Sequence, residues 1–284
     1  MLQIRSLQNT TFETLYLAFN EAFKDYNRSW NPYEFKDLLK RRGYVPEISF
    51  GAFADDKLVS FTFNCIDNYN GKKTAYDAGT GTLEAYRGKG LSTKIFEASI
   101  PYLKEAGVNQ YLLETQTTNH TAISVYKKIG FQIKRELSYF VQNTADVSIK
   151  SIKTDDDIII EPIEITDAEK AIEFCDFVPS WQNSFASLRR TELALKSIGA
   201  FIEDELVGYG IIVPESGDIP QLVVRKSNRR KGIGAALLSE LLKGNHHATT
   251  RIINVDTNCR DIKAFLAAQN IFPLGAQYEM IMKL

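Results

Sequence analysis

The chain has 284 residues, its 34 Lys and Arg nearly balance its 35 Asp and Glu, and 44% of its residues are hydrophobic. This length suits two domains of roughly 140 residues, and the composition excludes a disordered or fibrous chain. The balanced charge argues against a general nucleic-acid or membrane-surface binder, because such proteins carry a marked basic excess.

In chain order, the first half predicts two helices, at 8–27 and 33–42, from apolar residues at helical spacing. Three antiparallel strands follow at 47–54, 58–66 and 73–83. A helix is expected at 88–106, a strand at 110–115, a second helix at 119–129 and one or two closing strands at 131–141. The second half repeats this order. We therefore predict an α+β (mixed α/β) fold, in which a mixed, mostly antiparallel sheet is flanked by helices.

Three matched blocks recur in the same order in the two halves, which indicates a duplicated domain. The blocks are a strand–turn–strand (GAFADDKLVS at 51–60, GAFIEDELVG at 199–208), a basic Gly-rich turn (YRGKGLSTKI at 86–95, NRRKGIGAAL at 228–237), and a strand–Asn–helix (112–131, 253–272). We expect an N-terminal domain at 1–145, a polar linker at 146–157 and a C-terminal domain at 158–284.

The three cysteines, Cys65, Cys175 and Cys259, form no metal-ligand spacing, so we expect reduced thiols and no metal. The N-terminus lacks the basic and apolar regions of a secretory signal, and no run of about 18 apolar residues occurs. These features predict a cytoplasmic protein, monomeric or homodimeric, with no nucleic-acid or membrane partner.

Each Gly-rich turn leads from a strand into a helix. The first N–H groups of a helix lack partners, and the helix dipole adds positive potential there. Glycine lets a ligand approach the backbone, and the neighbouring Arg and Lys residues add charge, so the turn predicts a diphosphate cradle. The Walker pattern fails, because the residue five before Gly88 is Leu83 and Lys89 is followed by Gly90. The dinucleotide pattern also fails, because Gly88-x-Gly90 leads to Thr93 and Gly232-x-Gly234 leads to Leu237. A nucleotide-phosphate enzyme is therefore disfavoured.

These residues resemble the GNAT superfamily of acyl-CoA-dependent N-acyltransferases. Its signature is [RQ]-x-x-G-x-[GA] at a strand-to-helix turn, followed by a strand, an Asn, and a helix with a Tyr just before Gly-Phe. The first copy runs from Arg87 to Ser92, with Asn119, Tyr126 and Gly130-Phe131 after it; the second runs from Arg229 to Gly234, with Asn258. The first copy departs at Ser92, where Gly or Ala is expected. The resemblance covers both halves, so it implies two tandem GNAT-like domains.

The resemblance implies acetyl-CoA (coenzyme A) as co-substrate. It implies a set of CoA-binding residues in each half, with backbone N–H groups of the preceding strand near the carbonyl oxygen. In the first half these are Gly81, Thr82, Arg87, Gly88, Lys89, Gly90, Leu91, Ser92 and Asn119. In the second half they are Val223, Val224, Arg229, Arg230, Lys231, Gly232, Ile233, Gly234, Ala235 and Asn258.

The resemblance also makes Tyr126 the general acid for the leaving thiolate. Counting seven residues from Asn258 gives Phe265, and eleven gives Gln269, so the second copy lacks the Tyr and the Gly, and chemistry is expected in the N-terminal domain. The incoming amine must lose a proton, which favours a carboxylate base. Glu114 is the first candidate, and Asp77 and Glu84 are the others.

Other interpretations stay open at this point. Tyr126 also fits a core aromatic, and Asn119 a plain helix N-cap. The aromatic residues of the first helices fit either an acceptor wall or core; they are Phe19, Phe23, Tyr26, Trp30 and Tyr33, then Phe174, Phe177, Trp181 and Phe185. We expect an N-acetyltransferase that acts on a primary amine of a small molecule or peptide. The alternative is an acyl-CoA sensor or scaffold without turnover.

Overall fold

The computed structural model describes residues 1–25, 30–149 and 158–284. The chain forms two compact units: unit 1 is Met1–Arg135 with Tyr278–Leu284, and unit 2 is Glu136–Gln277. These bounds differ from the expected domains in two places, because the division falls within a strand near 135 and the last seven residues belong to unit 1. Most of the expected linker, residues 150–157, lies outside the described residues.

Unit 1 is a mixed sheet with helices on both faces. Its strands follow the order β1-β2-β3-β4-β5-β12, and all printed pairs are antiparallel except β4 with β5, which is parallel. The elements are β1 Leu2–Ser6, α1 Phe12–Ala22, α2 Pro32–Arg42, β2 Phe50–Ala54, β3 Lys57–Tyr69, β4 Lys72–Thr82, α3 Leu91–Glu105, β5 Gln110–Gln116 and α4 His120–Ile129. The predicted mixed fold is confirmed; strand β1 was not expected.

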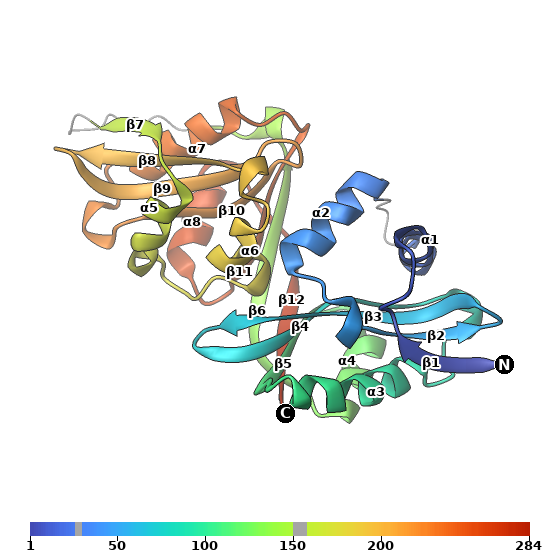
Figure 1. The fold of residues 1–284 in the computed structure, drawn as a ribbon. Helices are drawn as coiled ribbons and strands as arrows, with labels where there is room; N and C mark the ends of the chain where they lie inside the picture. The colour runs from blue at the N-terminus through green and yellow to red at the C-terminus, as the bar shows by residue number, and fades with distance from the viewer. Residues whose placement is uncertain (26–29, 150–157) are drawn as a thin grey trace. The chain divides into compact units, whose positions relative to one another are not determined.

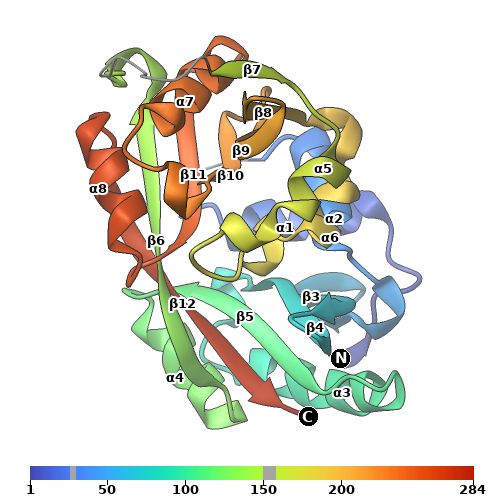
Figure 2. The ribbon, with the colours of Figure 1, turned by 90° about the vertical axis from the view of Figure 1, so that its left-hand side faces the viewer.

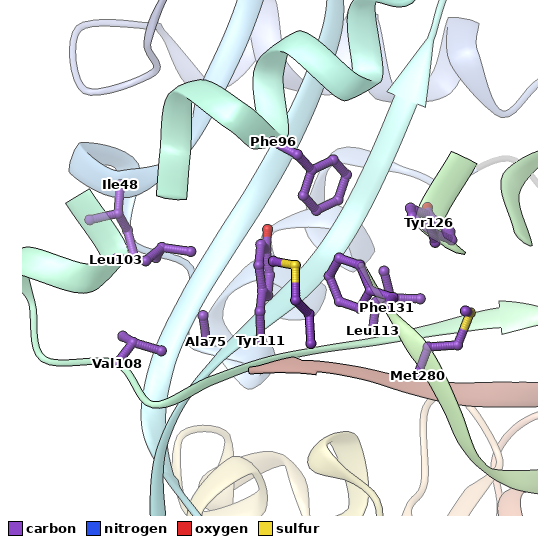
Figure 3. Close-up of a cluster of buried hydrophobic side chains, with 11 residues drawn as sticks. Ile48, Ala75, Phe96, Leu103, Val108, Tyr111, Leu113, Tyr126, Phe131 and Met280 are labelled. Atoms are coloured by element: carbon purple, nitrogen blue, oxygen red, sulfur yellow. The ribbon is translucent and has the colours of Figure 1, made fainter. Parts of the chain in front are cut away.

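Helices α1 and α2 lie on one face of this sheet, and α3 and α4 on the other (Figure 1). The α1 face is aromatic: the Phe19 ring lies 4.7 Å from Phe35 and 6.1 Å from both Phe61 and Phe63. The α3 face holds a second buried cluster that includes Phe96 and Tyr111 (Figure 3). Tight packing on both faces explains why β3 and β4 read as nearly continuous apolar or small residues.

Unit 2 has the same layout. Its strands follow the order β6-β11-β10-β9-β8-β7. The elements are β6 Gln132–Asn143, β7 Ile159–Pro162, α5 Ile165–Lys170, α6 Phe185–Arg189, β8 Lys196–Ile202, β9 Glu205–Val213, β10 Asp218–Val224, α7 Ile233–Lys243, β11 Thr249–Asp256, α8 Arg260–Ala268 and β12 Pro273–Lys283. Helices α7 and α8 cover one face and α5 and α6 the other (Figure 2).

The duplicated sequence blocks form duplicated turns. Asp55 and Asp56 join β2 to β3 with φ of 46° and 65°, and Glu203 and Asp204 join β8 to β9 with φ of 48° and 64°. Two successive left-handed residues match the twist of an antiparallel pair. The strand–turn–strand prediction for both blocks is therefore confirmed.

Strands β6 and β12 each contribute to both units. The residues of β6 from Glu136 belong to unit 2, and the residues of β12 from Tyr278 belong to unit 1. Within unit 1, Arg135 binds Glu279 through two hydrogen bonds, of 3.0 and 2.7 Å. A buried, bidentate ion pair thus fixes the last strand of unit 1, which comes from the far end of the chain.

Candidate functional site

The Gly-rich turn of unit 1 has the open backbone that a ligand cradle needs. Gly88 and Gly90 have φ of 75° and 71°, and a Cβ built at either position would meet no atom within 4 Å. Gly90 is the N-cap of α3, and no side chain caps this helix end. The first N–H groups of a 15-residue helix are therefore left without a side-chain acceptor beside open space, which suits an anion.

The turn of unit 2 has the same conformation with different residues. Gly232 is the N-cap of α7 with φ of 86°, again without a side-chain cap, and Arg230 takes the left-handed φ of 67° that Gly88 has in unit 1. A non-glycine residue is strained there by about 1–2 kcal/mol. Gly234 packs on a neighbouring helix, because a Cβ there would lie 3.2 Å from the Phe265 ring. The second cradle is thus more constrained than the first.

The arginine of each turn bonds to neighbouring segments of its own unit. Arg87 donates its Nε–H to the Thr82 carbonyl at 3.2 Å, and its other nitrogens reach the Ala22 carbonyl at 3.2 Å and the Asp25 carboxylate at 3.3 Å. These contacts hold the end of β4 and the end of α1 against the turn. The sequence pattern predicts that Arg87 supplies positive charge to a bound phosphate. In the structure, its guanidinium is hydrogen-bonded to the protein itself.

Arg229 repeats this arrangement in unit 2. It donates to the Val224 carbonyl at 3.0 Å and the Phe174 carbonyl at 3.3 Å, and it pairs with Asp176 at 2.9 Å. Asp25 and Asp176 were missed in the sequence. The available signal was an Asp near the end of the first helical region in both halves.

The remaining turn residues divide by burial. Leu91, Ile233 and Ala235 are buried in the cores, so only their backbone N–H groups are available at the helix start. Lys89 lies over the Tyr86 ring, with Nζ 3.0 Å from the Ala85 carbonyl. The Ser92 hydroxyl lies 3.2 Å from that of Thr82, so the departure from Gly or Ala is accommodated by a hydrogen bond.

The parallel strands β4 and β5 part just before the turn. They pair at only three positions, from Thr74↔Gln110 to Tyr76↔Leu112, although β4 continues to Thr82 and β5 to Gln116. The Leu83 N–H donates to Val59 on β3 at 2.9 Å. Because N–H groups alternate along an antiparallel strand, the Thr82 N–H points away from β3. Thr82, and not Gly81, is therefore oriented to donate a backbone hydrogen bond on the side of the parted ends.

The same alternation holds in unit 2. The Arg225 N–H donates to Val207 at 2.8 Å, which turns the Val224 N–H away from β9 and leaves the Val223 N–H facing it. Strand β10 pairs with β11 only at Asp218↔Arg251. In both units the central parallel strands thus separate before the Gly-rich turn. Different residues lie between the separated strands in the two units.

In unit 1, a tyrosine–carboxylate pair joins the parted strands. Tyr76 on β4 donates its hydroxyl to Glu114 on β5 at 3.0 Å. Tyr76 is buried, and both this burial and the nearby Glu114 charge raise the pKa of its phenol. Tyr111 and Leu113 face the α3 cluster, so the strand alternation puts Glu114 on the α2 face. Glu114 is therefore a half-buried acceptor that Tyr76 orients.

The other two carboxylates have different surroundings. Asp77 is buried, and it accepts hydrogen bonds from the Gly79 N–H at 2.8 Å and the Thr80 hydroxyl at 2.7 Å. Burial raises the pKa of Asp77 to about 6. It fixes the irregular stretch of β4 where the register with β3 shifts. Glu84 is exposed and pairs with Lys24 at 2.9 Å. Only Glu114 lies where the strands part and remains accessible.

Tyr126 is a member of the buried α3-face cluster (Figure 3). It is 8% exposed, and its ring centroid lies 5.8 Å from Phe96 and 5.9 Å from Phe131. Asn119 caps α4, with its side chain accepting the Ala122 N–H at 3.1 Å. The core and N-cap interpretations are thus observed for these two residues, and their roles toward CoA stay predictions.

The helix register corrects the match between the two copies. Cys259, not Asn258, is the N-cap of α8, and each cap follows a two-residue turn after its strand. The Phe131 N–H donates to the Tyr126 carbonyl, and the Ile271 N–H donates to the Leu266 carbonyl, at 3.0 and 2.9 Å. Leu266 therefore takes the place of Tyr126, where counting from Asn258 gave Phe265.

The same correction moves the glycine match from Gln269 to Asn270, whose φ is 63°. Gly130 also has a positive φ, of 116°, so an Asn replaces a Gly at a left-handed helix end. Asn258 lies one residue before the cap and donates its N–H to Asp256 at 2.9 Å. Unit 2 still has no hydroxyl at the position of Tyr126.

The aromatic residues of the first helical regions are mostly core. Phe19, Trp181 and Phe185 are buried, whereas Tyr33 is 69% exposed. Tyr26 lies outside the described residues. Within the described ranges, no helix is long and apolar enough to cross a bilayer, and no three His, Cys, Asp or Glu side chains gather to hold a metal ion.

Two family models match the chain. The Acetyltransferase (GNAT) family matches residues 12–131, and the Acetyltransferase (GNAT) domain matches residues 167–262. N-alpha-acetyltransferase 30 of Schizosaccharomyces pombe is 29% identical over 123 residues, which are 43% of this chain and 80% of that protein. Probable N-acetyltransferase san of Drosophila melanogaster is 30% identical over 106 residues, 37% of this chain and 55% of that protein. The chain thus spans only about half the length of some of these relatives.

Solved structures match over the whole chain. A GCN5-related N-acetyltransferase from Sphaerobacter thermophilus has a TM-score of 0.75 at 13% identity, covering 99% of this chain and 95% of that one. A tandem GNAT protein from the clavulanic acid biosynthesis pathway has a TM-score of 0.74 at 11% identity, covering 100% and 98%. At these identities the matches show the fold, including its tandem arrangement.

Proposed function

Because this chain belongs to the GNAT superfamily and is an acetyl-CoA-dependent N-acetyltransferase with two such domains in tandem, we propose that unit 1 carries the chemistry and acetylates a primary amine. One observation carries this assignment. Unit 1 combines an open Gly88–Gly90 turn with the oriented Glu114 carboxylate between parted strands.

The residues of unit 1 fit the co-substrate. A Cβ at Gly88 or Gly90 would occupy space that contains no other protein atom, and the uncapped start of α3 lies beside it. The N–H groups from Lys89 to Ser92 would hold the diphosphate of CoA, and the Thr82 N–H would polarise the acyl carbonyl. When bound, acetyl-CoA supplies an acetyl group activated as a thioester.

Glu114 takes the proton of the acceptor amine, directly or through a water. An alkyl ammonium with a pKa of about 10.4 costs about 4.6 kcal/mol to deprotonate at pH 7, whereas an α-ammonium with a pKa of about 7.8 costs about 1 kcal/mol. A single carboxylate base suits the proton that costs less to remove. We therefore favour the α-amine of a peptide as acceptor over a lysine or alkyl amine. The relatives named N-alpha-acetyltransferases support this choice.

Tyr126 holds the proton that the leaving sulfur takes up. The new C–N bond forms as the C–S bond breaks, Glu114 receives the amine proton, and the Tyr126 hydroxyl protonates the thiolate. With a phenol pKa of about 10 and a thiol pKa of about 8.5, this transfer is about 2 kcal/mol uphill. The positive potential at the starts of α3 and α4 reduces that cost.

The test is thiol release from acetyl-CoA with three short peptides: a free N-terminus without lysine, a blocked N-terminus with lysine, and a fully blocked control. We expect turnover with the free N-terminus. Tyr126→Phe keeps the ring packing and should lower kcat by about 10²-fold or more. Leu266→Met, at the matched position of unit 2, should leave kcat unchanged. A folded Tyr126→Phe protein with normal kcat contradicts the assignment, and acetyl-CoA binding without turnover on any peptide favours a sensor.

A further inference from the structure

In unit 2, a segment of the chain lies across the parted ends of β10 and β11. The segment is Ser180–Asn183, which includes a short 3-10 helix, and we call it the plug. The Gln221 side chain on β10 donates to the Asn183 carbonyl at 2.7 Å, and the Asn183 side chain donates to the Ile253 carbonyl on β11 at 2.9 Å. One residue of the plug is therefore bonded to both strands, beyond the single position at which they pair.

Further bonds fix the plug at both ends. Asn254 on β11 donates to the Ser180 hydroxyl at 2.7 Å, and Gln277 donates to Asn254. Gln221 is itself oriented by the Tyr209 hydroxyl, which donates to it at 2.7 Å. Asn254 has a left-handed φ of 63°, so the strand bends where it meets the plug. The arrangement is a connected polar network and not a loose loop.

The plug is dry. Ser180 is 0% exposed, Trp181 is 2% and Asn183 is 3% exposed. Displacing it would leave the buried amides of Asn183 and Gln221 without these partners, which is costly. These bonds would have to break for an extended ligand arm to enter between β10 and β11.

We propose that the plug closes unit 2 to the thioester arm of acetyl-CoA, so that the chain engages this arm at one place only, in unit 1. The proposal rests on the proposed function of unit 1. Under this proposal, the turn before α7 can still bind a diphosphate. No acyl group reaches an acceptor in unit 2. Unit 2 then needs no tyrosine at the position of Leu266, because no thiolate forms there to be protonated.

The first experiment is calorimetry of the full chain with acetyl-CoA and with adenosine 3′-phosphate 5′-diphosphate, the part of CoA that lacks the arm. We expect one site at which acetyl-CoA binds more tightly than the nucleotide. A second site with equal affinity for acetyl-CoA and for the nucleotide also agrees with the proposal, because that site then binds only the part that the two ligands share. A second site that prefers acetyl-CoA by about tenfold or more overturns the proposal.

The second experiment uses Trp181 as a reporter. The chain has two tryptophans, so Trp30→Phe leaves Trp181 as the single one. We expect its emission to stay constant as acetyl-CoA saturates the protein; a saturable change overturns the proposal. If wild type releases no thiol with any peptide, the function of unit 1 fails instead, and the arm-dependent site count still reports on the plug.

Discussion

Arg87 donates its Nε–H to the carbonyl of Thr82, the residue with which β4 ends, and Arg229 makes the same bond to Val224 in unit 2. The repetition in two units of different sequence shows that this geometry belongs to the turn itself. The guanidinium fixes the backbone that forms the cradle, so we expect its contribution to CoA binding to be indirect.

Arg87→Lys keeps the charge but loses the fork that reaches several acceptors at once. Since each lost hydrogen bond is worth about 1 kcal/mol, we expect the Kd of acetyl-CoA to rise about tenfold or more. Asp25→Asn is the matched variant, because it weakens one anchor and leaves Arg87 in place; it should raise Kd by a smaller factor. If Arg87 instead binds the diphosphate, Asp25→Asn releases it and Kd falls. Calorimetry distinguishes the two signs.

Asp77 should make unit 1 less stable as pH rises. Its pKa is about 6 in the folded protein and about 3.9 when unfolded, so the folded state binds the proton more tightly. The contribution of Asp77 to the free energy of unfolding is then fully present only below about pH 4, and about 3 kcal/mol of it is lost as the pH rises through 6 to about 7, with little further change above. Asp77→Asn keeps an acceptor for Gly79 and removes the charge.

Urea unfolding at pH 4, 5, 6 and 7 checks this expectation. The difference in unfolding free energy between Asp77→Asn and wild type should grow in favour of the variant as pH rises. A difference that stays flat across this range would show that the carboxyl titrates normally.

The Arg135–Glu279 pair should be essential to unit 1. The Glu279 side chain is 4% exposed and that of Arg135 is 14% exposed. Glu279→Gln leaves a buried guanidinium without its counter-charge and should cost about 3–5 kcal/mol of unfolding free energy. The double variant Arg135→Leu/Glu279→Leu removes both charges and should cost less. Denaturant unfolding measures this, and a single variant as stable as wild type contradicts it.

Glu114→Gln should remove the base while keeping a hydrogen-bond acceptor for Tyr76. We expect kcat/KM to fall about 10²-fold or more at pH 7 and to recover partly at high pH, where the acceptor amine is already neutral. Glu84→Gln, on an exposed carboxylate of the adjoining turn, is the control. A pH–rate profile is the measurement, and a Glu114→Gln profile identical to wild type excludes this base.

Much of the fold could be predicted from the sequence, because the conformational preferences of neighbouring residues agree with the fold. The Gly-rich turns, the Asp-Asp and Glu-Asp hairpins and the Asn119 cap all follow from the backbone preferences of single residues. Strands β1 and β7 were missed because each is a short edge strand with little alternation of its own. The match of Tyr126 to Phe265 was wrong by one residue, because counting from an Asn assumes that both Asn residues cap a helix.

The sequence by itself determined the duplication, the mixed fold and the two turns, since these depend on residues close together in the chain. The tertiary structure alone decided what each arginine holds, which carboxylate stays accessible, and that Ser180–Asn183 lies across β10 and β11. Such facts depend on pairs of residues far apart in the chain, such as Asn183 with Ile253 or Arg135 with Glu279. Their contact is set by packing of the whole unit, which no local pattern encodes.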